Sequence, residues 1–378
     1  MTPIFIRAVG FRVLTIVAAL LSGCVTTVNV PVPVTRPAEI DMSPYKRIAL
    51  AEIKENLGSD FSDHLKQDLL RSGRFEVVDR ERLDQILKEL RFSQSDIVDS
   101  RKSPKLGKMI GAAAIISGRL SGGYTQSVSQ YRTTCSVYPE GGGKPYSVPC
   151  TQYTRKGIYR TRGSVDVIDV QTGKILKSKQ LYETCELATQ ATGASPPSVD
   201  NNVLRDQCVQ RNVLKLVKAI TPWTEQVMVP FEKDDENPEI ERGITLAKAG
   251  QLNEAVKVFE QAAAAAERSL GVDASKGDKA QGDKAQGSVI GGAMDFLGNI
   301  LGQKGSSGAM SAKSIANAYW NLGLACEYTW QYDRAIEAFK KAFTYNPKEE
   351  YVREQSRVNS LRWDRKRLDE QEKKFRSS

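Results

Sequence analysis

The chain has 378 residues, which is enough for two or three hydrophobic cores. Lys and Arg outnumber Asp and Glu by 54 to 45, but the excess is modest and spread along the chain. This modest excess is better explained by ordinary solvent-exposed faces than by binding to an anionic surface, and we expect no nucleic-acid partner. His64 is the single histidine, so the composition argues against a zinc cluster.

The first 23 residues have the layout of a secretory signal peptide. Arg7 and Arg12 precede an apolar run over residues 13–21, which is shorter than the roughly 20 residues that a membrane-spanning helix needs. The tetrad Leu-Ser-Gly-Cys, ending at Cys24, resembles the lipobox of bacterial lipoproteins. This resemblance implies that Cys24 is lipidated, as with palmitate, and becomes the first residue of the mature chain. The alternative is an ordinary cleavage site beside a chance cysteine.

Residues 24–44 are rich in Val, Thr and Pro and lack a helical period, which predicts an extended tether between a membrane and the first domain. Val25 and Thr26 occupy the positions where an acidic residue retains many such lipoproteins at the inner membrane. The lipoprotein resemblance therefore implies a location on the periplasmic face of the outer membrane.

Four further cysteines fall into two local pairs, Cys135 with Cys150 and Cys185 with Cys208. An oxidising compartment favours disulfides, although four cysteines allow three connectivities that sequence alone does not distinguish. We favour the local pairings because nearer partners meet at lower entropic cost, and closing a loop of about 15 residues contributes roughly 3 kcal/mol in the chain-entropy model. Buried free thiols are the alternative.

The first domain is expected over residues 45–232, where strand and helix patterns alternate. Apolar residues recur every four positions after the first strand, as on an amphipathic helix, at Leu57, Phe61, Leu65 and Leu69. The other early elements are strands over 45–53, 73–79 and 112–120 and helices over 80–90 and 104–110. This order predicts an α/β layer in which helices cover a sheet.

A hairpin and a helix complete this domain. Residues 163–181 alternate in polarity around a turn at Thr172 and Gly173, which is typical of two antiparallel strands. The helix over 201–220 is expected to bury Val203, Leu214 and Val217.

Three motifs follow one another in this domain: "GRFEVVDRERLDQILKEL", "LGKMIGAAAIISGRLSGG" and "VDVIDVQTGKILKSKQ". In content and order they resemble the curli-secretion lipoprotein family (CsgG-like), and more loosely the LpoB-type lipoproteins that activate penicillin-binding proteins. The resemblance covers residues 48–220 and implies a three-layer α/β (α+β) domain with a mixed sheet. The family archetype forms an outer-membrane ring whose subunits each insert β-hairpins, which makes a homo-oligomer possible here.

In this chain, the segments around the two cysteine pairs correspond to the inserted hairpins of the family, and their polarity argues against a pore. A bilayer strand needs one apolar face over about 9–11 residues. Residues 124–134 have no such face, and the returning segment carries Arg155, Lys156 and Arg160. An oligomeric secretion channel is therefore the alternative function.

The second domain is expected over residues 237–351, after an acidic linker that begins at Glu232. Its sequence resembles tetratricopeptide repeats, an all-α fold whose grooves bind protein partners. The signature residues of the later copy are Tyr319, Leu322, Gly323, Ala335, Phe339, Ala342 and Pro347, and those of the earlier copy are Gly243, Leu246, Ala255, Phe259 and Ala262. Two repeats leave one face uncovered, so the terminal helix or the first domain must supply the missing wall.

Two more segments flank these repeats. Residues 269–311 form an insertion with a polar duplication and a short apolar stripe, for which packing on the repeats is favoured over a membrane contact. The tail from Lys348, which includes a charged helix over residues 352–378, has a narrow stripe of Tyr351, Val358, Leu361, Leu368 and Phe375. This stripe suits a cap or a short coiled-coil contact, and we favour the cap. Cys326 is interpreted as core filler.

Signals for an enzyme are weak. No Gly-x-Ser-x-Gly elbow is present, and Lys144 after three glycines is followed by Pro145 rather than Ser or Thr. We therefore expect no catalysis, metal or cofactor. The sequence predicts a lipid-anchored scaffold that holds a protein partner of the cell envelope in its helical groove.

Overall fold

The computed structural model describes residues 27–270 and 310–377, except for residues 79, 94, 95, 98, 100 and 112. The signal peptide, Cys24 and nearly all of the insertion 269–311 lie outside these residues. The chain divides into two compact units. The first, here called the sheet unit, comprises residues 33–225 and 360–377. The second, called the repeat unit, comprises the described residues within 27–32 and 226–359.

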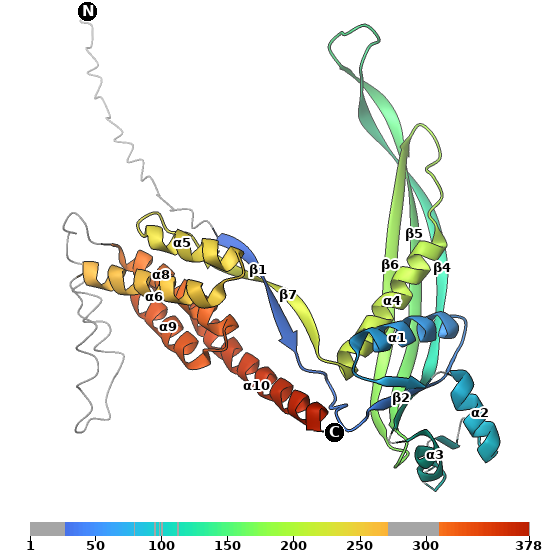
Figure 1. The fold of residues 1–378 in the computed structure, drawn as a ribbon. Helices are drawn as coiled ribbons and strands as arrows, with labels where there is room; N and C mark the ends of the chain where they lie inside the picture. The colour runs from blue at the N-terminus through green and yellow to red at the C-terminus, as the bar shows by residue number, and fades with distance from the viewer. Residues whose placement is uncertain are drawn as a thin grey trace, which may run out of the picture. The chain divides into compact units, whose positions relative to one another are not determined.

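Among the described residues, the sheet unit contains a five-stranded mixed sheet with the helices α1 to α4 and the end of α10 (Glu349–Ser377) (Figure 1). In chain order its elements are β2 (Arg47–Lys54), α1 (Gly58–Ser72), β3 (Glu76–Val78), α2 (Arg80–Leu90), α3 (Ser103–Ile110), β4 (Ala113–Val137), β5 (Tyr146–Asp169), β6 (Ile175–Thr192) and α4 (Asn201–Ile220). The strand order is β3-β2-β4-β5-β6; β2 runs parallel to β3 and β4, and β4, β5 and β6 are antiparallel. This arrangement confirms the predicted fold class.

Alternating residues of the central strands bury both faces of the sheet. Ile48 and Leu50 face one core with α1 and α4, whereas Ala49 and Ala51 face a second core with α2 and α3. The predicted stripe is correct, since Leu57, directly before α1, and Phe61, Leu65 and Leu69 within it are at most 1 % exposed. The sheet unit therefore has three layers.

The predicted buried face of α4 is wrong at two positions. Val203 and Leu214 are each 44 % exposed, while Leu204, Cys208 and Leu216 are fully buried against the sheet. The helix carries apolar residues on both sides, and one of its buried positions is the disulfide-bonded Cys208, so hydrophobic periodicity alone gave the wrong rotation.

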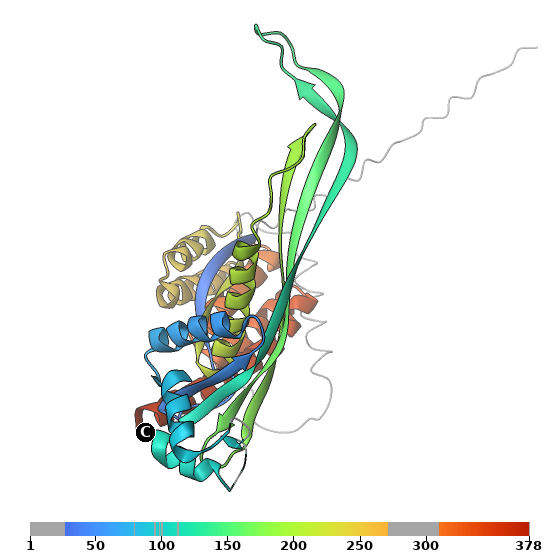
Figure 2. The same cartoon turned by 90° about the vertical axis from the view of Figure 1, so that its right-hand side faces the viewer.

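β4 and β5 form a hairpin that extends far beyond the covered sheet (Figure 2). Their pairing continues from Ala114 opposite Asp169 to Val137 opposite Tyr146, whereas β6 pairs with β5 only as far as Gln152. The end of the hairpin is therefore a two-stranded arm.

The segment expected to be a free tether is instead partly a paired strand. β1 (Thr27–Arg36) forms a two-stranded sheet with β7 (Trp223–Glu232). Its alternating valines explain the pairing, because Val30 and Val32 are 1 % and 3 % exposed.

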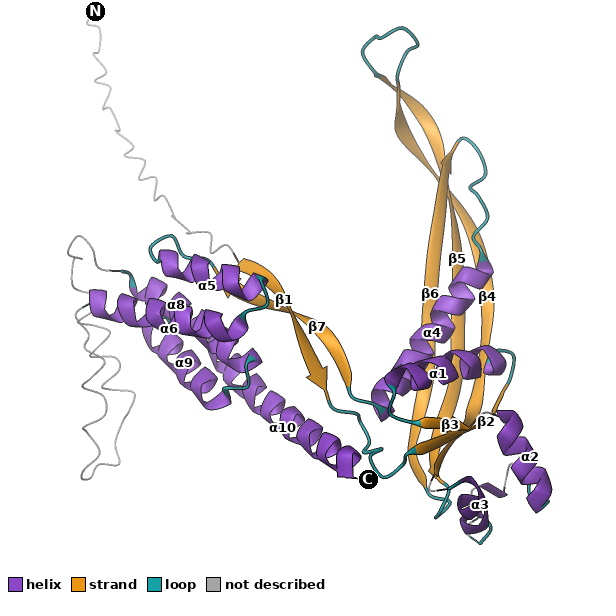
Figure 3. Cartoon of the chain, in the orientation of Figure 1, coloured by secondary structure: helices purple, strands orange, loops and turns teal. Residues whose placement is uncertain are grey.

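The repeat unit is built from helices (Figure 3). They are α5 (Pro238–Lys248), α6 (Leu252–Ser269), α8 (Ala312–Tyr328), α9 (Tyr332–Tyr345) and the first part of α10 (Glu349–Ser377). Residues 226–232 of β7 also belong to this unit, although we expected them in the first domain.

The second part of α10 belongs to the sheet unit rather than forming a separate tail. The Gln371 side chain accepts a hydrogen bond from the Ala38 backbone N–H at 3.0 Å and donates one to the Ala38 carbonyl at 3.1 Å. Lys374 forms an ion pair with Asp41 at 2.8 Å. These contacts hold the segment that leads into β2.

Candidate functional site

The two helical hairpins of the repeat unit are built on the same contact. A Cβ atom at Gly243 would lie 2.3 Å from the ring of Phe259, and one at Gly323 would lie 2.5 Å from the ring of Phe339. Glycine is required at both positions because the phenylalanine packs directly on the partner helix. The same small-to-aromatic contact in both hairpins supports two copies of one repeat.

The other signature residues form the core around these contacts. Four alanines, one on each side of each phenylalanine, are completely buried: Ala255, Ala262, Ala335 and Ala342. Tyr319 and Leu322 are 6 % and 8 % exposed, and Pro347 is an exposed residue after the end of α9.

The face that two repeats leave uncovered is covered by α10 and β7. Tyr351 of α10 is fully buried, and its ring centroid lies 5.0 Å from that of Trp320. Trp320 donates a hydrogen bond to the Pro230 carbonyl at 3.2 Å, and Phe231 stacks on Phe259 with centroids 5.6 Å apart. The capping role predicted for the start of the terminal helix agrees with these contacts.

A cavity of about 250 Å³ lies between α6, α8 and α9. Its lining combines apolar and charged side chains: Glu260, Ala263, Ala264, Glu267, Tyr319, Leu322, Arg334, Glu337, Ala338 and Lys341. We call it the repeat groove. Its residues come from both hairpins, so its shape depends on the packing of one repeat against the other.

Polar contacts order the floor of the repeat groove. Glu267 is 5 % exposed and accepts a hydrogen bond from the Tyr345 hydroxyl at 3.0 Å. Lys341 donates to the Tyr319 hydroxyl at 3.0 Å and lies 4.8 Å from the centre of its ring. Burial, followed by the hydrogen bond and charge of Glu267, raises the pKa of Tyr319 well above its usual value, so the phenol stays neutral.

Cys326 lies in the core behind this groove. Its thiol is completely buried and unpaired, and burial raises its pKa to about 11. Because the thiolate is the reactive form, this cysteine is inert in the folded chain, as expected for a core residue.

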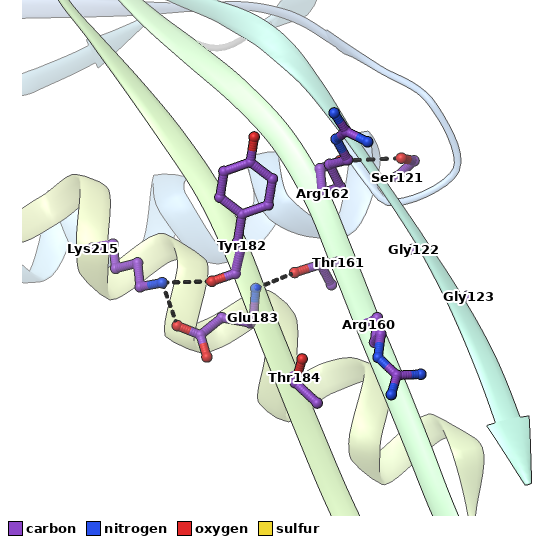
Figure 4. A pocket seen from close by; sticks show the side chains of 10 residues that line it. All are labelled: Ser121, Gly122, Gly123, Arg160, Thr161, Arg162, Tyr182, Glu183, Thr184 and Lys215. Atoms are coloured by element: carbon purple, nitrogen blue, oxygen red, sulfur yellow. Dashed lines mark hydrogen bonds and ion pairs between the residues drawn. The ribbon is translucent and has the colours of Figure 1, made fainter.

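The sheet unit has a larger cavity, of about 700 Å³, along β4, β5 and β6 near α4 (Figure 4). Lys215 of α4 donates to the Tyr182 carbonyl and pairs with Glu183, both at 2.6 Å. Arg160 and Arg162 lie on the other side of β5. From the sequence, Arg160 was expected only to oppose membrane insertion, and no pattern indicated this cavity.

Both local disulfides are present. Cys135–Cys150 joins β4 to β5 in the hairpin arm, and Cys185–Cys208 joins β6 to α4, with Cα atoms 5.8 Å and 5.7 Å apart. The favoured connectivity is therefore the one found in the structure.

Removal of the two disulfides is expected to have different effects. Cys185 and Cys208 are buried in the domain core, so the Cys185→Ala/Cys208→Ala variant should lose about 3 kcal/mol of unfolding free energy. The Cys135→Ala/Cys150→Ala variant should leave the melting temperature of the sheet unit nearly unchanged, because this bond closes only the arm. Its effect should be faster proteolysis between the two positions. Equal melting temperatures for the two variants in calorimetry would contradict this assignment.

The structure places the two weak enzyme candidates on different elements. His64 is half-buried on α1, and Lys144 is exposed in the loop between β4 and β5. In the described part of the chain, no three His, Cys, Asp or Glu side chains are grouped so that they could hold a metal ion. Among the described helices, none combines the length and apolar character needed to cross a membrane.

Comparisons with known proteins support both units. Residues 38–229 match the family described as curli production assembly/transport component CsgG, and residues 316–349 match the tetratricopeptide repeat. No curated protein matches the chain. Among solved structures, lipoprotein GNA1162 from Neisseria meningitidis is similar, with 12 % identity and a TM-score of 0.22 over 45 % of this chain and 97 % of its own. Another is a protein described as a neuraminyllactose-binding hemagglutinin homologue from Helicobacter pylori, with 6 % identity and a TM-score of 0.24 over 49 % of this chain and 91 % of its own.

Proposed function

The chain belongs to the CsgG family of curli production assembly and transport components, and from this premise we propose that it is a lipid-anchored envelope scaffold. The scaffold stands on the periplasmic face of the outer membrane, is not an enzyme, and binds a protein partner through its helical repeats. The family alone does not fix this role, because one fold can serve several functions.

The observation that carries the proposal is the repeat groove. Its lining includes apolar side chains at Leu322 and Ala338 beside groups of both signs of charge, since Glu260 and Arg334 form an ion pair at 2.9 Å. Such a surface suits an amphipathic peptide segment, whose apolar side chains enter the groove while its polar groups meet the rim. The rigid two-hairpin frame holds the groove open without an ordering cost at binding.

Crosslinking in living cells tests the groove. A photoreactive amino acid at Glu337, which lines the groove, should give one discrete adduct with a second protein. The matched control places the same amino acid at Lys340, which is exposed on the same helix outside the groove lining. Adducts of equal yield at both positions would refute a specific site.

The anchor has its own test. Labelled palmitate should be incorporated into the wild-type chain and should be absent from the Cys24→Ala variant, which should appear in the soluble periplasmic fraction. Several acyl chains hold a protein firmly, since each buried methylene contributes about 0.8 kcal/mol. Unchanged labelling of the variant would remove the lipoprotein proposal.

An oligomeric secretion channel is the second candidate, and the length of the β4–β5 hairpin favours it. β4 spans 25 residues and β5 spans 24, so the whole β4–β5 hairpin is long enough for the membrane strands of such a channel. The hairpin carries charged residues on both strands, among them Arg132 on β4 and Arg155 and Lys156 on β5, which weighs against insertion into lipid. Rings in detergent, seen by negative-stain microscopy, would favour the channel, and a monomer released by Cys24→Ala would favour the scaffold.

A further inference from the structure

Three arginines on one face of the long strands have no side-chain partner among the residues that the structure describes. Arg119 of β4 and Arg160 and Arg162 of β5 are exposed. Within the described residues, their guanidinium groups form no hydrogen bond or ion pair. Guanidinium groups that a protein leaves unpaired on a shared face are free to bind an external anion.

Strand alternation places the three arginines on the face opposite α1 and α4. Leu120, next to Arg119, is fully buried in the core beneath those helices. Thr161, between the two arginines of β5, is 5 % exposed and accepts a hydrogen bond from Asn212 of α4 at 2.7 Å. Figure 4 shows Arg160 and Arg162 on the side of β5 away from Lys215.

The strand register brings the three groups together. Arg162 lies opposite Ser121 and Arg119 lies opposite Ser164, so these two arginines are diagonal neighbours, about 7–8 Å apart along the sheet. Arg160 is two residues along the same strand, about 7 Å from Arg162. These separations are within reach of flexible arginine side chains that converge on one small ligand.

A hollow lies over this arrangement. Arg119, Arg162 and Tyr182 line a cavity of about 350 Å³, with Glu55 at its edge. Arg162 and Tyr182 also line the 700 Å³ cavity, to which Arg160 contributes. We call this shared surface the arginine face.

The charges of the arginine face select an anion. Glu55 is the acidic residue in the lining of the 350 Å³ hollow. Glu186, on the same face of β6, forms an ion pair with Lys156 at 2.5 Å, and Asp166 lies further along β5 opposite Ser117. Arg119, Arg162 and Glu55 leave one positive charge in the lining of the 350 Å³ hollow. Arg160 adds a second in the neighbouring cavity and Lys54, opposite Arg119 in the strand register, adds a third, and this excess attracts a phosphate group.

We propose that the arginine face binds a phosphate-bearing ligand. Arg119 and Arg162 donate paired N–H groups to the phosphate oxygens, and Arg160 balances the remaining charge. Tyr182 also lines the hollow, and its hydroxyl group donates to the Gln180 side chain at 3.3 Å. The phosphate belongs either to a soluble molecule or to a lipid headgroup, and the chemistry of recognition is the same for both.

Isothermal titration calorimetry of the full chain with inorganic pyrophosphate tests this site, with Cys24→Ala in every protein so that acyl chains do not contribute. Arg119→Gln and Arg162→Gln should each weaken binding about tenfold or more. Arg211→Gln is the matched control, because Arg211 is exposed on α4 of the same unit, outside both cavities. All variants should keep the wild-type melting temperature, since these side chains are exposed.

Vesicles then identify the source of the phosphate. Binding to phosphatidic acid vesicles but not to phosphatidylcholine vesicles, with loss in Arg162→Gln, would assign a lipid headgroup. Pyrophosphate binding without vesicle binding would assign a soluble ligand. The proposal is overturned by absent pyrophosphate binding, by equal loss in Arg211→Gln, or by arginine variants that alter only self-association of the chain.

Discussion

Replacing Phe339 with alanine is expected to lower the unfolding free energy of the repeat unit by about 3–5 kcal/mol. The ring is completely buried, fills the space above Gly323, and lies 5.3 Å from the Trp320 ring. Its loss leaves a cavity that the two closely packed helices cannot fill by moving together.

The matched control for this variant is Phe343→Ala on the same helix. Phe343 is 40 % exposed, so its truncation removes little buried area and should change the unfolding free energy by less than about 1 kcal/mol. Because two units unfold within one chain, hydrogen exchange of the α8 and α9 amides is the appropriate measurement. Similar exchange rates in the two variants would contradict the packing assigned to Phe339.

Replacing Arg357 with methionine is expected to cost about as much, roughly 3–5 kcal/mol, through charge rather than volume. The Glu327 side chain is fully buried, and Arg357 lies 3.5 Å from its carboxylate. Arg357 also donates to the Tyr328 hydroxyl and pairs with Glu354. Methionine keeps the apolar stem of the side chain but leaves the buried carboxylate without this cation.

The pH dependence of this variant distinguishes charge from packing. Without Arg357, burial should raise the pKa of Glu327 above its unfolded value of about 4.3, so the folded state binds the extra proton between those two pKa values. Stability relative to wild type should therefore fall as the pH rises through that window, by at most about 1.4 kcal/mol per pH unit. Adding Glu327→Gln should remove this slope.

Two results would separate the effect of the buried charge pair from a general effect of replacing an arginine or from lost packing. Arg353→Met changes an exposed arginine one turn earlier on α10 and should leave stability nearly unchanged. If Arg357→Met loses the same free energy at every pH, the lost contact is one of packing, and the buried charge pair contributes nothing. Denaturant titrations monitored by circular dichroism at several pH values provide the measurement.

Local sequence patterns predicted most of the fold. The four-residue recurrence in α1 and the strand pattern of β2 arise because the sheet has a hydrophobic core on each face. Such periodicity indicates which face of an element is buried. The repeat hairpins were recognisable because Gly243 and Gly323 each meet a phenylalanine at the same spacing. The lipidation of Cys24 remains a prediction.

The remaining features depend on contacts between distant segments. The buried face of α4 is set partly by the Cys185–Cys208 bond, and β1 is ordered by pairing with β7, whose residues lie far away in the sequence. The arginine face was not predicted because Arg119 and Arg162 come together only through the β4–β5 register. Charged residues in strands had been considered only as obstacles to membrane insertion.

The shared helix α10 has a practical consequence for dissecting this protein. Its residues up to 359 complete the repeat unit, and those from 360 complete the sheet unit. A polypeptide truncated before α10 would lose both the hydrogen bond from Gln371 to the Ala38 backbone and the packing of Tyr351 on Trp320. No single cut yields two independently folding fragments, so recombinant pieces should be designed as a circular permutation or expressed together for complementation.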